Sequence, residues 1–101
     1  MDHTTVTPVR VRRAAQTMAG HLLAWRKLQR LPQRIVAARA GVALSTLQRV
    51  EHGDLGVSLE TLLRVARALG RLDSIETCLD PLDTDLGRLR AAETLPLRVR
   101  S

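Results

Sequence analysis

The segment 33–53, QRIVAARAGVALSTLQRVEHG, constrains the fold of this chain more than any other part of it. A small residue, Ala37, lets two short helices cross closely at a steep angle, and Gly41 tolerates the positive φ that a tight link between them needs. Apolar residues at helical spacing turn one face of each helix inward: Val36, Ala40, Val42, Leu47 and Val50. The segment therefore predicts helices over about 32–40 and 44–52, the second stopping at Gly53.

The second of these helices has an outward face that suits the major groove of DNA. If Leu47 and Val50 turn inward, four side chains face out: Leu44, Ser45, Gln48 and Arg49. A short helix presented in this way after a tight turn is the recognition helix of a helix-turn-helix. The spacing therefore predicts binding to double-stranded DNA.

Basic residues are concentrated in the half of the chain that contains this motif. Residues 1–53 carry nine Arg or Lys against two Asp or Glu, whereas residues 54–101 carry seven against eight. Clustered positive charge is the electrostatic signature of a polyanion binder. An arginine-rich coding bias would explain fifteen arginines against one lysine, but it would not explain the asymmetry, so we favour a functional interpretation.

Three further helices are expected around the motif. Thr17 is a candidate cap for a helix to about Gln29, with Met18, Leu22 and Trp25 on its core face. Ser58 caps a helix over 59–69 that stops at Gly70, and its inner face is formed by Leu59, Leu62, Leu63, Ala66 and Leu69. Asp73, with Glu76 three residues on, begins a fifth helix that ends before residues 80–81. No strand signal is present, so the predicted fold class is all-α.

The two ends of the chain leave alternatives open. Residues 1–16 are expected to be a loose basic arm, whose arginines either contact DNA or make no contact; they are Arg10, Arg12 and Arg13. Residues 80–101 contain TDLGRLRAAE, which could form a short helix with Leu82, Leu86 and Leu89 on one side. These leucines either pack on the fifth helix or form a segment that docks on a partner.

Several classes of site and location are disfavoured. The histidines lack metal-ligand spacing (His3, His21 and His52), and Ser45 has no base beside it in a motif, so no metal, cofactor or enzymatic activity is expected. No apolar run approaches the length of a membrane span, and the first residues lack the apolar core of a secretory signal. Cys78 is the only cysteine, which fits a reducing cytoplasm and a buried structural thiol.

With these elements in place, the chain over about 18–79 resembles the Cro and lambda-repressor type of helix-turn-helix, the XRE family. The matching pieces are LLAWRKLQRLPQ, ARAGV, STLQRVEHG and SLETLLRVARALG. The resemblance implies a five-helix, all-α DNA-binding domain over 17–79 with a short C-terminal extension. It also implies a recognition helix that docks in the major groove of an inverted-repeat operator.

The resemblance assigns roles to particular residues. Gln33, in the first turn of the second helix, would bond a backbone phosphate. Base edges would be read from the third helix by Leu44, Ser45 and Arg49, while Gln48 and His52 would contact the DNA backbone. Arg49 could pair with O6 and N7 of guanine, which is worth about 1–3 kcal/mol of discrimination. Arg26 and Glu51 would form a largely buried salt bridge between the first and third helices.

Three positions depart from the family's pattern. Pro32 stands where Thr or Ser usually caps the second helix. Arg30 replaces the glycine that usually closes the first helix, so it must adopt a left-handed conformation or change the turn. Ala43 replaces the usual Ser cap of the third helix, which could cost about 1 kcal/mol of local stability.

A narrower resemblance concerns the run ALGRLDSIETCLDPLDTDLGRLRAAETLPLRVR. It resembles the extension of small regulators encoded beside HipA-type kinases, HipB-like antitoxins that repress their own operon and bind the toxin. Two functions follow as hypotheses. One is a homodimeric repressor of its own operon that dimerises through exposed apolar residues of the fifth helix: Leu72, Ile75 and Leu79. The other is an antitoxin that neutralises a HipA-type kinase toxin through residues 80–101.

Overall fold

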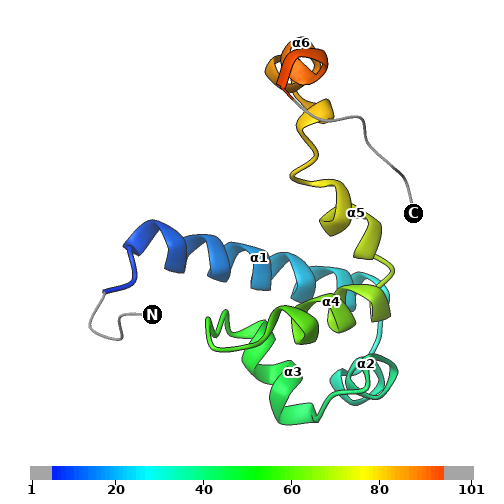
Figure 1. Ribbon diagram of the computed structural model, residues 1–101. Coiled ribbons are helices and arrows are strands. Elements are labelled where there is room, and N and C mark those ends of the chain that lie inside the picture. The colour runs from blue at the N-terminus through cyan, green and yellow to red at the C-terminus, as the bar shows by residue number, and fades with distance from the viewer. Residues whose placement is uncertain (1–5, 95–101) are drawn as a thin grey trace.

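The computed structural model describes residues 6–94, and every regular element in that range is helical (Figure 1). The elements are α1 (Val9–Leu28), α2 (Gln33–Ala40), α3 (Leu44–Glu51), α4 (Leu59–Ala68), α5 (Leu72–Thr77), the 3-10 turn η1 (Pro81–Asp83) and α6 (Asp85–Thr94). The predicted all-α class and the order of the five domain helices are confirmed. None of the helices within 6–94 is long and apolar enough to cross a membrane.

The core lies where α2, α3 and α4 meet beneath α1. Helix α2 packs against both α3 and α4, and α1 packs across α3. The largest fully buried side chains come one from each of the three shorter helices: Val36, Leu47 and Val65. Leu22 of α1 belongs to the same cluster, and so does Leu69, which directly follows α4. The core therefore fixes the angle between α2 and α3, which is the geometry that a helix-turn-helix depends on.

The two turns that flank α2 have left-handed backbone conformations. Gly41 has φ 71° and ψ 34°, as its place between the two short helices predicts, and the next N–H, that of Val42, donates to Ala37 O at 3.0 Å. Arg30 has φ 57°, which is the left-handed conformation that glycine adopts more easily than a residue with a side chain. The turn is therefore formed with Arg30 at the position where the resemblance leads us to expect glycine.

The caps of the short helices differ in quality. Ser58 accepts a hydrogen bond from Thr61 N–H at 3.0 Å, which confirms it as the cap of α4. Pro32 and Ala43 precede α2 and α3 and provide no side-chain acceptor. The prediction that Asp73 caps the fifth helix is wrong. Arg71 N–H bonds Ala66 O at 2.8 Å and closes α4, so α5 begins directly at Leu72 and Asp73 lies inside its first turn.

Helix α1 begins at Val9, so the prediction of a loose arm is wrong for residues 9–16. Pro8 precedes the helix in an extended conformation, and its carbonyl accepts from Val11 N–H and Arg12 N–H at 3.1 and 3.2 Å. No Gly or Pro follows until Gly20, so nothing interrupts the helix before Thr17. The basic run 10–13 therefore lies on exposed helical turns, while residues 1–5 of the expected arm are outside the described range.

Several apolar side chains expected in the core are exposed. Met18 is 45% exposed, Trp25 37% and Leu59 69%, because α1 reaches the core only through Ala19 and Leu22 and because the core of so short a domain is small. The indole of Trp25 lies instead under the Arg71 guanidinium, 4.3 Å from the ring centre. The expected burial of Cys78 is also wrong, since α5 has only six residues and buries none of them.

The C-terminal segment stands apart from the core. Helix α6 makes its main contacts with η1 and lies well away from α2 and α3 (Figure 1). Leu82, Leu86 and Leu89 are 39%, 62% and 75% exposed, so the expectation that these leucines pack on the fifth helix does not hold for their side chains. The last part of the predicted extension, 95–101, lies outside the described residues.

Candidate nucleic-acid interface

Helices α2 and α3 bring the predicted DNA-binding side chains onto one surface. Leu47 and Val50 are buried beneath α3, and the opposite side of the helix exposes Leu44, Ser45, Gln48 and Arg49. His52, which follows α3, is also exposed, and its Nδ1 lies 2.6 Å from Gln48 O. Gln33, the first residue of α2, is joined to α3 by a hydrogen bond of 3.3 Å from Gln48 Nε2 to Gln33 Oε1. The two helices therefore present their polar ends side by side.

A polar network beneath this surface ties three helices together. Arg26 Nε of α1 donates to Glu51 Oε2 of α3 at 2.6 Å, and the two side chains are only 13% and 5% exposed. Arg26 also donates through Nη1 to Leu31 O at 3.0 Å, and Gln33 Nε2 of α2 donates to Glu51 Oε1 at 2.8 Å. The expected Arg26–Glu51 ion pair is thus present. No buried side-chain N or O atom within 6–94 lacks a hydrogen-bond partner, so the carboxylate is fully engaged.

The contact between Gln33 and Glu51 was missed by sequence reasoning, which expected the amide of Gln33 to face a phosphate. An amide nitrogen carries two N–H groups, and the bond to Glu51 uses one of them. The other remains a donor at the N-terminus of α2. Neither α2 nor α3 has a side-chain cap, so first-turn N–H groups of both helices lack a side-chain acceptor there. Helix N-termini of this kind favour anions such as phosphate.

Arg49 is held at one end of the surface by a carboxylate that sequence reasoning did not identify. Arg49 Nε donates to Asp54 Oδ2 at 2.7 Å, and Asp54 Oδ1 accepts from Gly56 N–H, also at 2.7 Å. The hydrogen bond from Arg49, followed by that from Gly56, lowers the pKa of the Asp54 carboxyl, and the pair raises the pKa of Arg49. The available signal was the D-x-G spacing, since Asp side chains bond the N–H two residues on in such turns.

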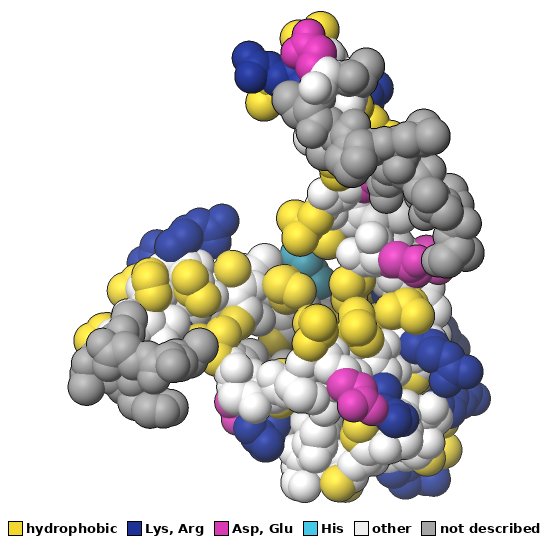
Figure 2. Space-filling model, viewed as in Figure 1, with side chains coloured by type: hydrophobic (Ala, Val, Ile, Leu, Met, Phe, Trp, Pro, Cys, Tyr) yellow, Lys and Arg dark blue, Asp and Glu magenta, His cyan; other side chains and the backbone are white. Residues whose placement is uncertain are grey.

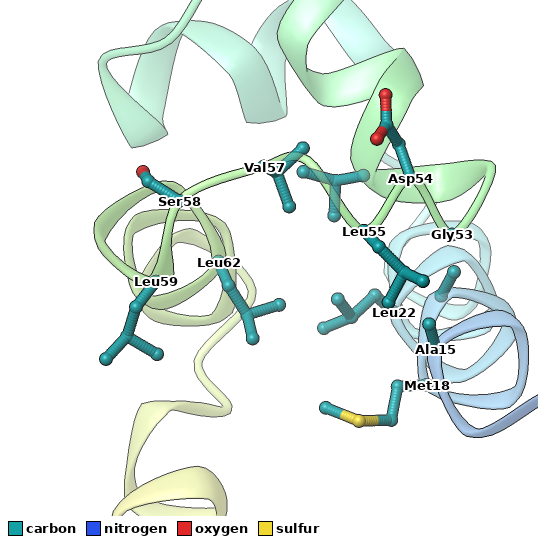
Figure 3. A pocket seen from close by; sticks show the side chains of 12 residues that line it. Ala15, Met18, Leu22, Gly53, Asp54, Leu55, Val57, Ser58, Leu59 and Leu62 are labelled. Carbon is teal, nitrogen blue, oxygen red and sulfur yellow. The ribbon is translucent and has the colours of Figure 1, made fainter. Parts of the chain in front are cut away.

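An apolar surface lies next to α1, α4 and α5. Hydrophobic side chains gather where α1, α4 and α5 come together (Figure 2). Part of it is a hollow of about 330 Å³ between α1, the loop before α4 and the start of α4, where the side chains of Met18, Leu55, Leu59 and Leu62 lie (Figure 3). A second hollow of about 320 Å³ shares Met18 and Leu22 with it and extends to Trp25, Ile75 and Cys78.

The predicted dimer residues lie beside this apolar surface. Leu72 and Ile75 of α5 are partly buried, whereas Leu79, just beyond α5, is 90% exposed. The exposure expected of these three residues is therefore found in full only at Leu79. Across residues 6–94, no group of three or more His, Cys, Asp or Glu side chains could hold a metal ion.

Comparison with known proteins identifies the family of the DNA-binding part. A family model described as "Helix-turn-helix" matches residues 22–74, more than half of the 101-residue chain and the range that contains α2, α3 and α4. Neither a curated protein nor a solved structure gives a significant match. The matched range contains Gly41, the buried face of α3 and the Arg26–Glu51 pair described above. The chain therefore belongs to the XRE family of helix-turn-helix proteins and is a DNA-binding regulator of transcription.

Proposed function

We propose that this regulator is a sequence-specific repressor of its own operon, acting in the cytoplasm as a homodimer on an inverted repeat. The observation that carries the proposal is the exposed polar face of α3, which the Arg26–Glu51–Gln33 network fastens to α1 and α2. A rigidly held helix can present its side chains to base edges without first being ordered by the DNA. The excess of basic residues in 1–53 supplies attraction to phosphates on the same half of the chain.

On the α2–α3 surface, some side chains contact base edges and others contact the DNA backbone. Arg49 reads a guanine through its guanidinium, and Leu44 and Ser45 contact neighbouring base edges. Gln33 contacts a phosphate with its second amide N–H, assisted by the N-terminus of α2. Gln48 and His52 contact the DNA backbone and fix the register of the helix in the groove.

The dimer forms through the apolar surface next to α5. Leu72, Ile75 and Leu79 bury their exposed area against the same residues of a second copy, as a two-fold interface requires. The two α3 helices then lie about 34 Å apart, one turn of DNA, so the operator is expected to be an inverted repeat with that half-site spacing.

The test is fluorescence anisotropy of the purified chain on DNA from its own upstream region and on scrambled DNA, at two salt concentrations. The proposal expects tight binding that favours the native sequence and weakens steeply with salt. Equal, weak binding to both duplexes would contradict it, because the basic half of the chain would then attract DNA without reading it.

A second function, antitoxin activity, is favoured by the C-terminal segment. We propose it as the alternative role, in which residues 80–101 dock on a HipA-type kinase toxin and DNA binding serves autoregulation. Leu86 and Leu89 of α6 are 62% and 75% exposed, which leaves an apolar edge available to a partner.

Deletion of residues 80–101 separates the two functions. An antitoxin is expected to lose toxin binding and retain DNA binding, because α6 lies away from α2 and α3. If the truncated chain still neutralises the kinase encoded beside it, or if no such kinase binds the full chain, the antitoxin role is wrong.

A further inference from the structure

The contact between Arg49 and Asp54 fixes one edge of the guanidinium and leaves the other open. Arg49 Nε donates to Asp54 Oδ2 at 2.7 Å, and Asp54 Oδ1 accepts from Gly56 N–H, also at 2.7 Å. An arginine joined to a carboxylate through Nε keeps the edge formed by Nη1 and Nη2 free. That end-on edge has the two parallel donors that match O6 and N7 of guanine.

We propose that Asp54 is a positioning residue for base recognition: it orients Arg49 so that the Nη1 and Nη2 edge is presented to a guanine. The proposal rests on the proposed reading of a base by Arg49. It assigns part of the sequence preference to a loop residue outside α3, because Asp54 follows the recognition helix and its own carboxylate need not touch DNA.

The carboxylate is itself held in place, which positioning requires. The Asp54 side chain accepts from Gly56 N–H, and the Asp54 backbone N–H donates to Arg49 O at 3.1 Å. The loop is thus fastened to the end of α3 through both backbone and side chain. Space at Gly56 is also limited, since a Cβ there would lie 3.1 Å from Arg49 Nη2 and 3.1 Å from Asp54 Oδ1. The turn therefore fits the pair closely.

The Asp54 carboxylate affects DNA binding in two ways, and one of them improves discrimination. The Arg49 side chain is 51% exposed, and ordering it before binding removes part of the entropy that a free arginine loses on the DNA. A negative charge close to the DNA surface also repels phosphates, which weakens binding to any sequence. That repulsion acts on specific and random DNA alike, so the wider gap between them comes from the ordering of Arg49, which favours only the site that carries the guanine.

The experiment uses the full chain to select duplexes from a randomised pool, followed by anisotropy on the selected duplex and on one with its contacted guanine replaced. Arg49→Ala identifies that guanine as the base pair where preference is lost. Asp54→Asn is the test variant, because Asn can still accept from Gly56 N–H while it loses the charge. Glu60→Gln is the matched control: it makes the same charge change in an exposed ion pair with Arg64 on α4, 2.9 Å between Nη2 and Oε2.

We expect Asp54→Asn to reduce the preference for guanine by about 2- to 10-fold, the range expected when one side chain is no longer ordered in advance. Binding to random DNA should be equal or tighter, and Glu60→Gln should leave the preference unchanged. On the Arg49→Ala background Asp54→Asn should cause no further loss of preference, which a general structural effect on the fold would not predict.

Two results would overturn the inference and can be told apart. If Arg49→Ala abolishes the preference but Asp54→Asn leaves it intact, or tightens specific and random binding equally, Asp54 does not position Arg49 and the proposed function stands. If the unmodified chain selects no sequence, or Arg49→Ala keeps the same preference, the base-reading role of Arg49 is wrong and the inference is overturned together with it.

Discussion

The α2–α3 surface and the segment 72–94 both expose side chains, but they differ in how those side chains are held. On the α2–α3 surface, Gln33, Gln48 and Arg49 each donate to a partner within the domain. In the C-terminal segment, by contrast, several large apolar side chains are exposed, and Leu79, Leu86 and Leu89 are between 62% and 90% exposed. The polar side chains of the α2–α3 surface are therefore held in place by hydrogen bonds within the domain, without a ligand.

This difference is what the two modes of recognition proposed for this chain would require. Preorganised polar groups suit a ligand with a fixed pattern of donors and acceptors, such as a DNA groove. Exposed leucines without a covering layer suit a protein surface that supplies the missing contacts. The comparison predicts that substitutions at the polar network change the domain itself, whereas those in the C-terminal segment change assembly.

The largest effect is expected at Glu51. Glu51→Ala leaves Arg26 buried without its carboxylate and also removes the acceptor of Gln33, which should lower the free energy of unfolding by about 3–5 kcal/mol. Urea denaturation measures it. Glu60→Ala, in an exposed ion pair on α4, is the control and should cost about 0–1 kcal/mol. Equal losses for the two variants would show that the buried network does not hold the α2–α3 surface.

The next effect concerns assembly. Leu79→Glu should weaken the dimer at least about tenfold, since burying a leucine is worth about 1.5–3 kcal/mol per copy and a charge cannot take its place. Sedimentation equilibrium measures the dissociation constant, and the melting temperature of the monomer should change little because the side chain is 90% exposed in the single chain. Leu89→Glu on α6 is the matched control. A dimer weakened by Leu89→Glu but not by Leu79→Glu would move the interface from α5 to α6.

Sequence discrimination is expected to separate Arg49 from Gln33. Arg49→Ala should reduce the preference for specific DNA by about 1–3 kcal/mol, whereas Gln33→Ala should weaken binding to all sequences alike. Anisotropy on specific and random duplexes distinguishes the two. Because Gln33 also donates to Glu51, the comparison must be made well below the melting temperature of the Gln33 variant. Equal losses on both duplexes for both variants would remove the division between base and phosphate contacts.

A smaller effect is expected at the start of the recognition helix. Ala43→Ser should stabilise the domain by about 1 kcal/mol, because a hydroxyl at this position can accept from a first-turn N–H of α3 that has no side-chain acceptor. Ser58→Ala should cost a similar amount, since Ser58 makes that kind of bond to Thr61 N–H at the start of α4. Thermal unfolding measures both. An unchanged stability in Ala43→Ser would mean that the N-terminus of α3 gains nothing from a side-chain cap.

Much of the domain could be predicted from the sequence because local rules decide it. Gly41, the inward face of α3 and the Ser58 cap follow from helical spacing and from the chemistry of single residues. The prediction was wrong where tertiary packing, or contact with a residue distant in sequence, determines where a side chain lies or where a helix begins. Trp25 has core spacing but lies on the outside beneath Arg71, and helix α1 continues back to Val9 because nothing in 9–16 stops it.

In the candidate site, too, some contacts could be predicted from the sequence and others depend on the tertiary structure. Arg26 and Glu51 were predicted by resemblance, and the structure adds the bond from Gln33 that completes the network. Asp54 was missed because its role depends on a turn that brings its carboxylate back to Arg49, and spacing alone does not show which partner such a turn selects.

The smallest expected effect is the pH response of the Arg49–Asp54 pair. The pKa of Asp54 lies below its ordinary value of 3.8, chiefly because Arg49 donates to the carboxylate. A depressed pKa in the folded state means that the pair contributes stability above the ordinary value and loses it as the pH falls through the folded value, so the change falls below about pH 4. Titration of the Asp54 carboxyl carbon by NMR should show the lowered midpoint. In Arg49→Ala the midpoint should rise while part of the shift remains, because Gly56 N–H still donates. An unchanged midpoint in that variant would show that the ion pair is not maintained in solution, and Asp54 could then not position Arg49.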